Sequence, residues 1–261
     1  MARVFVTGSA DGLGLIAARL LADQGHEVVL HARNERRAAD AFAAVPRASA
    51  VVIGDLSTIA EMRAVAKDAN ATGAFDAVIH NAAVGYREQR RLITRDGLCH
   101  LFAINVLAPY LLTVLIELPR RLIYLSSGLH RSGNPSLDDL QWAQRPWHAM
   151  QAYSDSKLFD AVLAAAVARY QPAVCSNAVE PGWVATKMGG PNAPDDPTLG
   201  ATTQAWLAVS DDPEALVSGG YFFHQRLRET SPAVHDHQLQ DGLLAYCAAA
   251  TGEALPWAER N

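Results

Sequence analysis

Short apolar runs rich in Val, Ile and Leu alternate along this chain with longer stretches that have the apolar spacing of helices. The apolar runs predict six strands, at residues 4–6, 28–31, 51–53, 77–80, 121–126 and 174–179. The stretches between them predict helices at residues 13–25, 35–44, 58–71, 96–117 and 151–170. Because strands that alternate with helices form right-handed βαβ units, we expect an α/β fold, a doubly wound parallel sheet with helices on both faces.

Composition narrows the classes of protein that fit this pattern. Half of the residues are apolar and 19% are charged, which supports a large core and argues against disorder. The net charge is −5 without a basic tract, so we expect no nucleic-acid partner. Cys99, Cys175 and Cys247 are far apart, and the histidines near the end lack the spacing of zinc ligands. We therefore expect no disulfide framework, no metal and a reducing, cytoplasmic location.

Residues 101–118 are apolar enough to be tested as a membrane span. A spanning helix needs about 20 mostly apolar residues, and Asn105, Pro109 and Glu117 interrupt this stretch. We expect a buried helix here and no membrane partner. The chain also starts directly in a predicted strand, so we expect no signal peptide.

Three glycines, Gly8, Gly12 and Gly14, occupy the turn between the first predicted strand and the first predicted helix. Glycine adopts positive φ and lets a ligand approach the backbone closely. The N-terminus of the helix that follows attracts a phosphate through its N–H groups and its dipole. This turn therefore predicts a cradle for the pyrophosphate of a dinucleotide, as in Rossmann folds.

Tyr153 and Lys157 are four residues apart, so they share one face of a predicted helix. A nearby ammonium lowers the pKa of a phenol and suits it to move a proton to or from a carbonyl oxygen. Ser127 ends a predicted strand at the edge where such sheets bind ligands, and its hydroxyl could hold that oxygen. Adjacent Ser126 should point to the opposite face. The alternatives are an exposed Tyr–Lys pair and a serine that caps a turn.

Five motifs follow the glycine turn in order: HNAA (80–83), INV (104–106), YLSS (124–127), YSDSK (153–157) and EPGWVAT (180–186). Together they resemble the short-chain dehydrogenase/reductase family, from residue 4 to about 186. Residues 218–236 are similar to the branch of retinol dehydrogenases and carbonyl reductases. The resemblance implies that Ser127, Tyr153 and Lys157 are catalytic, and that Asn105 helps to hold a proton-relaying water. A satisfied core amide is the alternative for Asn105.

The resemblance also implies which residues bind the cofactor. They are Gly8, Ser9, Asp11, Gly12, Leu13 and Gly14 in the turn, Arg33, Asp55 and Leu56 after the second and third strands, Asn81, Ala82 and Ala83 after the fourth, Tyr153 and Lys157, and Pro181, Gly182, Val184 and Thr186 after the sixth. The chain departs from the family at His80 and Ala83, where Asn and Gly are common.

Arg33 follows the second predicted strand, where an acidic residue would bind a ribose 2′-hydroxyl. Its planar, permanently charged guanidinium suits a 2′-phosphate instead. Arg36 and Arg37 either add charge or lie on a solvated helix face. Asp11 in the glycine turn instead favours NAD(H), because some NADP-binding relatives have a basic residue at that position. The sequence favours NADP(H), with NAD(H) as the alternative.

We therefore expect residues 1–261 to form a single NAD(P)-binding Rossmann-fold domain with a substrate insert at about 128–150 and a small C-terminal lid at about 187–200. Within the insert, Trp142, Trp147 and Met150 either line a substrate mouth or anchor the insert. The lid prediction follows from the Gly-, Pro- and Asp-rich sequence GGPNAPDDPTLG at 189–200.

The predicted function is NADP(H)-dependent oxidoreduction of a small, apolar carbonyl or alcohol substrate, with Tyr153 as acid and base. The alternative is a non-catalytic, NADP-sensing regulator on the same fold, which would not need to keep Tyr153 and Lys157. The resemblance further implies homodimers or homotetramers that pair through helices 96–117 and 151–170.

Overall fold

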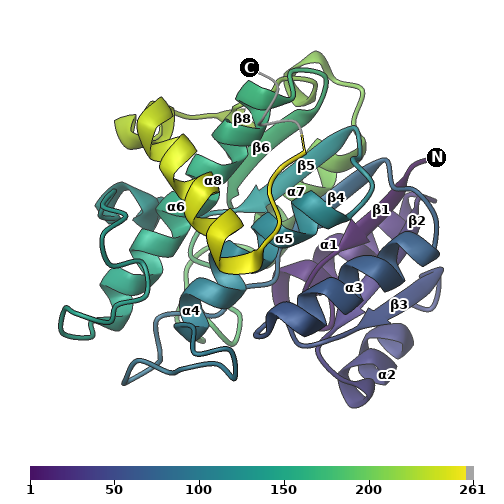
Figure 1. Cartoon of the computed structure of the whole chain (residues 1–261). Coiled ribbons are helices and arrows are strands. Elements are labelled where there is room, and N and C mark those ends of the chain that lie inside the picture. Colours follow the sequence, from purple (N-terminus) through teal and green to yellow (C-terminus); the bar gives the residue numbers. More distant parts are fainter. Residues whose placement is uncertain (257–261) are drawn as a thin grey trace.

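The computed structural model of the chain describes residues 1–256, and its centre is one eight-stranded sheet (Figure 1). The strands lie in the order β3-β2-β1-β4-β5-β6-β7-β8, and every neighbouring pair is parallel except β7 and β8. Their bounds are β1 Arg3–Val6, β2 Glu27–Ala32, β3 Ala50–Ile53, β4 Ala77–His80, β5 Arg121–Leu125, β6 Cys175–Glu180, β7 Tyr221–Phe223 and β8 Arg226–Leu227.

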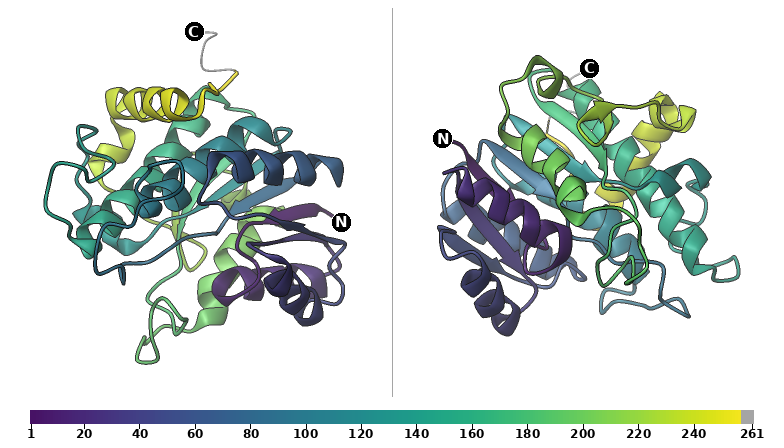
Figure 2. Two further views of the ribbon diagram at one scale, coloured as in Figure 1. Left: turned by 60° about the horizontal axis from the view of Figure 1, so that its bottom comes forward. Right: turned by 180° about the vertical axis from the view of Figure 1, so that it is seen from behind.

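Helices cover both faces of the sheet, which confirms the doubly wound α/β fold (Figure 2). One face carries α1 (Gly12–Asp23), α2 (Glu35–Ala44) and α7 (Pro197–Val209). The other carries α3 (Ile59–Ala71), α4 (His100–Phe102), α5 (Ala108–Leu115) and α6 (Ala149–Tyr170). The last helix, α8 (His237–Thr251), packs outside α5 and α6. Four short turns of helix complete the fold: η1 (Ala103–Leu107), η2 (Gly128–Ser132), η3 (Pro213–Ala215) and η4 (Pro232–His235).

The long helix expected at 96–117 is interrupted. It begins at His100, passes through the π-helical turn η1 and ends as α5 at Leu115. This segment is buried almost throughout, in keeping with the expected core helix. Within residues 1–256, no helix combines the length and the apolar character that crossing a membrane requires.

Four elements were not expected: α7, α8, β7 and β8. Asp196 accepts hydrogen bonds from the N–H groups of Thr198 and Leu199, and Pro197 occupies the first turn of α7. An Asp-Pro pair is thus a helix start here, although the composition around it predicts a loop. Residues 197–200 of the expected lid therefore belong to α7. His224 and Gln225, both with positive φ, form the tight turn between the short strands β7 and β8.

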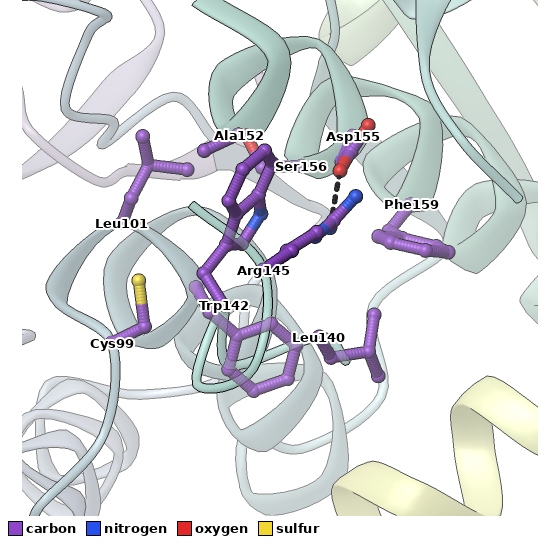
Figure 3. A pocket seen from close by; sticks show the side chains of 10 residues that line it. Cys99, Leu101, Leu140, Trp142, Arg145, Ala152, Asp155, Ser156 and Phe159 are labelled. Carbon is purple, nitrogen blue, oxygen red and sulfur yellow. Dashed lines mark hydrogen bonds and ion pairs between the residues drawn. The ribbon is translucent and has the colours of Figure 1, made fainter. Parts of the chain in front are cut away.

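Side chains of the insert at 128–150 pack against the body of the protein (Figure 3). Trp142 is 6% exposed and lies in the main core cluster, with the Arg145 guanidinium 3.6 Å from its ring centre. Arg145 in turn binds Asp155 on α6, with 2.7 Å between Nη2 and Oδ2. Trp147 donates its indole N–H to the Glu88 carbonyl. Trp142 and Trp147 therefore anchor the insert, whereas Met150 is exposed.

His31, at the end of β2, fixes the position of the glycine turn. Its Nδ1 accepts the Gly8 N–H at 2.9 Å, and its Nε2 donates to the Gly54 carbonyl at 3.0 Å. The His31 N–H donates to the Ser9 hydroxyl at 2.8 Å. Burial lowers the pKa of His31 to about 4, which keeps the ring neutral so that Nδ1 can accept a hydrogen bond.

The pKa of His31 predicts a loss of stability in mild acid. The unfolded chain binds a proton at His31 below about pH 6.5, whereas the folded chain resists protonation down to about pH 4. The stability that neutral His31 contributes should therefore be fully present above about pH 6.5. When the pH falls from about 7 to about 5, the free energy of unfolding should decrease by about 2 kcal/mol. Denaturant unfolding at the two pH values measures this loss.

His31→Gln should lower stability at neutral pH and flatten this part of the pH dependence. His80, which is buried and has a pKa lowered by burial to about 3, will keep its own contribution in that variant. The exposed His237→Gln is the matched control and should retain the wild-type slope. Equal slopes in wild type and His31→Gln would contradict the prediction.

Candidate active site

A cleft of about 610 Å³ crosses the carboxyl edge of the sheet, from the glycine turn to Tyr153 and Lys157 on α6. This edge is where open α/β sheets bind ligands, and the volume is in the range of small-molecule sites. Most of the residues predicted to bind a cofactor line it: Gly8, Asp11, Gly12, Leu13, Arg33, Asp55, Leu56, Asn81, Ala82, Ala83, Tyr153, Lys157, Pro181 and Thr186.

Four other predicted residues, Ser9, Gly14, Gly182 and Val184, are absent from this lining. Ser9 is fully buried and holds the backbone of His31. At Gly14, a Cβ would lie 2.3 Å from Nδ2 of Asn81, so glycine is required by packing. Gly182 has a φ of 86° and lies against Asp195, while Val184 is buried next to α7.

The glycine turn is locked to the end of β4. Gly8 has a φ of 64°, and a Cβ there would lie 2.8 Å from Cα of Ala82. The Thr7 hydroxyl accepts the N–H groups of Asn81 at 2.9 Å and of Ala82 at 3.0 Å. The side-chain amide of Asn81 in turn donates a hydrogen bond to the Thr7 carbonyl, with 2.9 Å between Nδ2 and the oxygen. Two strand ends thus form one rigid platform, with the N-terminus of α1 beside it.

The charges at this end of the cleft are mostly positive. Arg37 binds Asp11, with 3.1 Å between Nη2 and Oδ2, and also donates to the Ala10 carbonyl. Lys187, from the loop after β6, binds the same Asp11 carboxylate. Burial raises the pKa of Asp11, but its bonds to Lys187, the Gly12 N–H and Arg37 outweigh burial and lower it. Arg33 and Arg36 are exposed and also line the cleft.

Tyr153 and Lys157 lie at the other end, and both are more than nine-tenths buried. The Lys157 Nζ is 5.8 Å from the centre of the Tyr153 ring. It donates to the Leu125 carbonyl at 2.6 Å and to the Asp160 carboxylate at 2.7 Å. The alternative of an exposed Tyr–Lys pair is therefore excluded.

The expectation that Lys157 would lower the pKa of Tyr153 is only partly right. Burial is the largest effect and raises that pKa, Lys157 lowers it, and the Asp160 carboxylate raises it again. The net direction is upward, because the phenol is buried and Asp160 offsets the ammonium. The prediction took the Lys157 ammonium into account but not the Asp160 carboxylate beside it.

The two serines after β5 differ from the expectation, because Ser126 is among the residues that line the cleft and Ser127 is not. Ser126 is buried and donates its hydroxyl to the Lys157 carbonyl at 2.7 Å. The Ser127 side chain lies close enough to the Tyr153 phenol to lower its pKa. Its hydroxyl also accepts the Leu129 N–H at 3.3 Å and so caps η2. Ser127 thus lies beside Tyr153, and its catalytic role remains a prediction.

Asn105 lies in the π-helical turn η1 and is 1% exposed. Its Oδ1 accepts the Val84 N–H at 2.8 Å, and its Nδ2 donates to the Val84 carbonyl and to the Ser156 hydroxyl, both at 3.0 Å. The amide therefore clamps the loop after β4 to α6, as the satisfied core amide would. A water-holding role for Asn105 remains a prediction.

Three residues that shape the site were not expected: Thr7, His31 and Asp160. The contact of Arg37 with the glycine turn was also not expected. Thr7 and His31 act across neighbouring strands, so no local spacing indicates them. Asp160 is three residues after Lys157, and this helical neighbourhood is visible in the sequence. No metal cluster of three or more His, Cys, Asp or Glu occurs in residues 1–256.

The cleft fits a dinucleotide. Glycine is required at Gly8 and Gly14, the start of α1 faces the cleft through Gly12 and Leu13, and cations surround the far end. Such a start of a helix binds phosphate oxygens through its N–H groups. Lys157 has three N–H donors, two of which go to Leu125 and Asp160, and it lines the cleft.

Known proteins resemble this chain along its whole length. The model of the short chain dehydrogenase family matches residues 2–120. An oxidoreductase of Emericella nidulans is 43% identical over 260 residues, which cover 98% of this chain and 99% of that protein. Short-chain dehydrogenase chyC of Penicillium rubens is 41% identical and covers 98% of this chain and 100% of its own. Retinol dehydrogenase 13 of Mus musculus is 29% identical, covering 97% and 84%, which agrees with the expected branch.

Solved structures share the fold. A protein from Mycobacterium paratuberculosis has a TM-score of 0.83 at 25% identity, over 98% of this chain and 95% of that one. A short chain dehydrogenase from Shigella flexneri, solved with NADP, has a TM-score of 0.67 at 24% identity, over 86% and 97%. With its full-length relatives and this arrangement of the cleft, the chain belongs to the short-chain dehydrogenase/reductase family and is an oxidoreductase.

Proposed function

We propose that this oxidoreductase is NADP(H)-dependent and interconverts a carbonyl and an alcohol on a small, apolar substrate. One observation carries the proposal: Tyr153 and Lys157, with Ser127 next to the Tyr153 phenol, lie at one end of a cleft whose other end is a glycine turn ringed by cations. A proton-transfer group and a dinucleotide cradle thus share one cavity.

Each side chain at the Tyr153 end has a distinct part in the reaction. A bound nicotinamide supplies the hydride for reduction and accepts it in oxidation. Tyr153 gives its phenolic proton to the substrate oxygen in reduction and takes it back in oxidation. Ser127 donates a hydrogen bond to the same oxygen while charge develops on it. Lys157 favours the phenolate by its charge and directs its third N–H at a ribose hydroxyl.

The preference for NADP(H) rests on the charges that line the far end of the cleft. Arg33, Arg36, Arg37 and Lys187 are cationic, whereas Asp11 and Asp55 are the lining carboxylates there. The presence of Asp11 in the sequence argues against a bound 2′-phosphate. In the structure, Arg37 and Lys187 neutralise its charge. Arg33 is exposed and can bind a 2′-phosphate with two N–H groups. NAD(H) lacks the group that would use this charge.

The preference for an apolar substrate rests on the side chains near Tyr153. Val84, Ile104, Leu125 and Met188 line this part of the cleft. Met188 packs against Gly85, where a Cβ would lie 2.5 Å from its Cγ. We propose that residues 187–196 act as the substrate lid, since Lys187 and Met188 both reach the cleft. Trp142 and Trp147 do not line it.

A homodimer or homotetramer of this chain would use a surface other than the one that the family resemblance implies. The helix α8 packs on α6 and α5, the helices expected to pair between subunits. Nearly all of α6 from Ala152 to Val167 is buried within one chain. Pairing through these helices would first require α8 to move.

The first test replaces the proposed acid and base. Tyr153→Phe should lower turnover of a carbonyl panel with NADPH by about 100-fold or more, because general acid–base groups contribute at least that factor. NADPH affinity, followed by nucleotide fluorescence, should remain within about threefold, since the phenol contributes little to binding.

Tyr170→Phe, at the C-terminal end of the same helix, is the matched control and should leave both quantities unchanged. Unchanged turnover in Tyr153→Phe would remove Tyr153 from the mechanism. Tight NADPH binding without turnover in the wild type would instead favour the NADP-sensing regulator.

The second test concerns the choice of nucleotide. Arg33→Ala should weaken NADPH binding by about 10- to 100-fold, since charge-assisted hydrogen bonds contribute about 1.5–3 kcal/mol. NADH binding should barely change, because NADH has no 2′-phosphate. Calorimetry with both nucleotides measures the two effects. Arg47→Ala, an exposed arginine outside the cleft, is the control, and an equal loss for NADH and NADPH would contradict the assignment.

A further inference from the structure

A buried ion pair lies directly behind the proposed proton donor. Asp160 and Lys157 are both 2% exposed, and Oδ2 of Asp160 is 2.7 Å from Nζ of Lys157. The two residues are one helical turn apart on α6 and therefore share a face. Removing two charges from water is costly unless they pair closely. This carboxylate is thus a built partner of the ammonium and not a chance surface contact.

The pair fixes the direction of the Lys157 ammonium. One N–H goes to Asp160 and one to the carbonyl of Leu125, the last residue of β5 before the two serines. The side chain is therefore held between α6 and the strand end that carries Ser127. Its remaining N–H is the one available to the cleft that Lys157 lines.

The groups around Asp160 leave Lys157 as its compensating charge. Tyr124 on β5 faces Asp160, and burial together with this carboxylate raises the pKa of Tyr124. The Tyr124 hydroxyl is 2.8 Å from that of Thr113, which is 3.1 Å from Nε2 of the neutral His80. Titratable groups on other elements packed on α6 have different partners: Glu180 binds Tyr221, Asp241 binds Arg169, and Cys247 lies near Tyr110. On α6 itself, Asp155 binds Arg145.

We propose that Asp160 is a positioning residue for the reaction, whose carboxylate orients Lys157, offsets its charge and so sets the pH range in which Tyr153 ionises. This inference rests on the proposed function, because it concerns the same proton-transfer site. Asp160 does not line the cleft; its carboxylate holds Lys157, and its charge also raises the pKa of Tyr153.

The test removes the charge and keeps the shape. In Asp160→Asn, the Lys157 ammonium is no longer offset, so Tyr153 should ionise at a pH lower by about one unit. The ultraviolet absorbance of tyrosinate against pH measures this midpoint, with Tyr153→Phe in each background to isolate Tyr153. The kcat/KM for alcohol oxidation should shift to lower pH by the same amount, because the phenolate is the base in that direction.

Asp155→Asn is the matched control. Asp155 is also buried on α6 and paired with a cation, but its partner is Arg145 and not Lys157. The pH midpoint of Tyr153 ionisation in Asp155→Asn should equal that of the wild type. An unchanged or higher midpoint in Asp160→Asn, or an equal shift in Asp155→Asn, would overturn the proposal.

A second neutral variant, Asp160→Ser, replaces Asp160→Asn if the latter does not fold, and circular dichroism and thermal melting show whether each variant folds. Whichever variant folds can be used to measure the shift of the Tyr153 ionisation midpoint. Failure of both to fold while Asp155→Asn folds would show a purely structural role and would also overturn the proposal.

The absorbance midpoint needs no turnover, so the two ideas fail separately. A shifted midpoint in an enzyme that reduces no carbonyl would defeat the proposed function and retain the coupling of Asp160 to Tyr153. An active enzyme with an unshifted midpoint would defeat the role of Asp160 and retain the function.

Discussion

The contact between the glycine turn and the end of β4 is the constraint on which the cleft depends. Successive strands build outward from β1 to β3, and the chain then returns to β4 on the other side of β1. A crevice opens where the order reverses. At that point Gly8 lies against Ala82 with no room for a side chain, and the Thr7 hydroxyl joins both strand ends. Any displacement of this turn would move the cradle and the floor of the cleft together.

Charges at the two ends of the cleft are each held by a partner of opposite charge. Asp11 is neutralised by Arg37 from α2 and Lys187 from the loop after β6, so the nucleotide end depends on both elements. Lys157 is held by Asp160 and by the carbonyl that ends β5. At the nucleotide end the counterpart charges come from distant parts of the chain, whereas at the catalytic end Asp160 lies on the same helix as Lys157. In both places the pairing determines the field that a ligand meets.

The difference between contacts made locally and contacts made between distant parts of the chain explains how much the sequence could predict. The six central strands, the glycine turn and the Tyr153–Lys157 face follow from local periodicity and spacing, and the structure brings them to one cleft. His31 and Thr7 could not be found this way, because they bind across strands that only the folded sheet makes adjacent. Asp196 and Pro197 have turn composition, yet they begin α7 because the Asp196 side chain caps its first N–H groups. The Trp142 and Trp147 side chains are ambiguous in sequence, since anchoring and substrate contact both require apolar groups.

The burial that makes the catalytic end precise also works against its chemistry. A buried phenol resists ionisation, and the pKa of Tyr153 is raised despite a lysine one turn away. Leaving the Lys157 ammonium uncompensated would favour the phenolate but place an unpaired charge in the core, which destabilises a fold strongly. Asp160 resolves this conflict in favour of stability and leaves Lys157 enough charge to oppose the burial of Tyr153. A bound nucleotide that takes the third N–H of Lys157 would add to the same balance, so proton transfer and cofactor binding are coupled through one ammonium group.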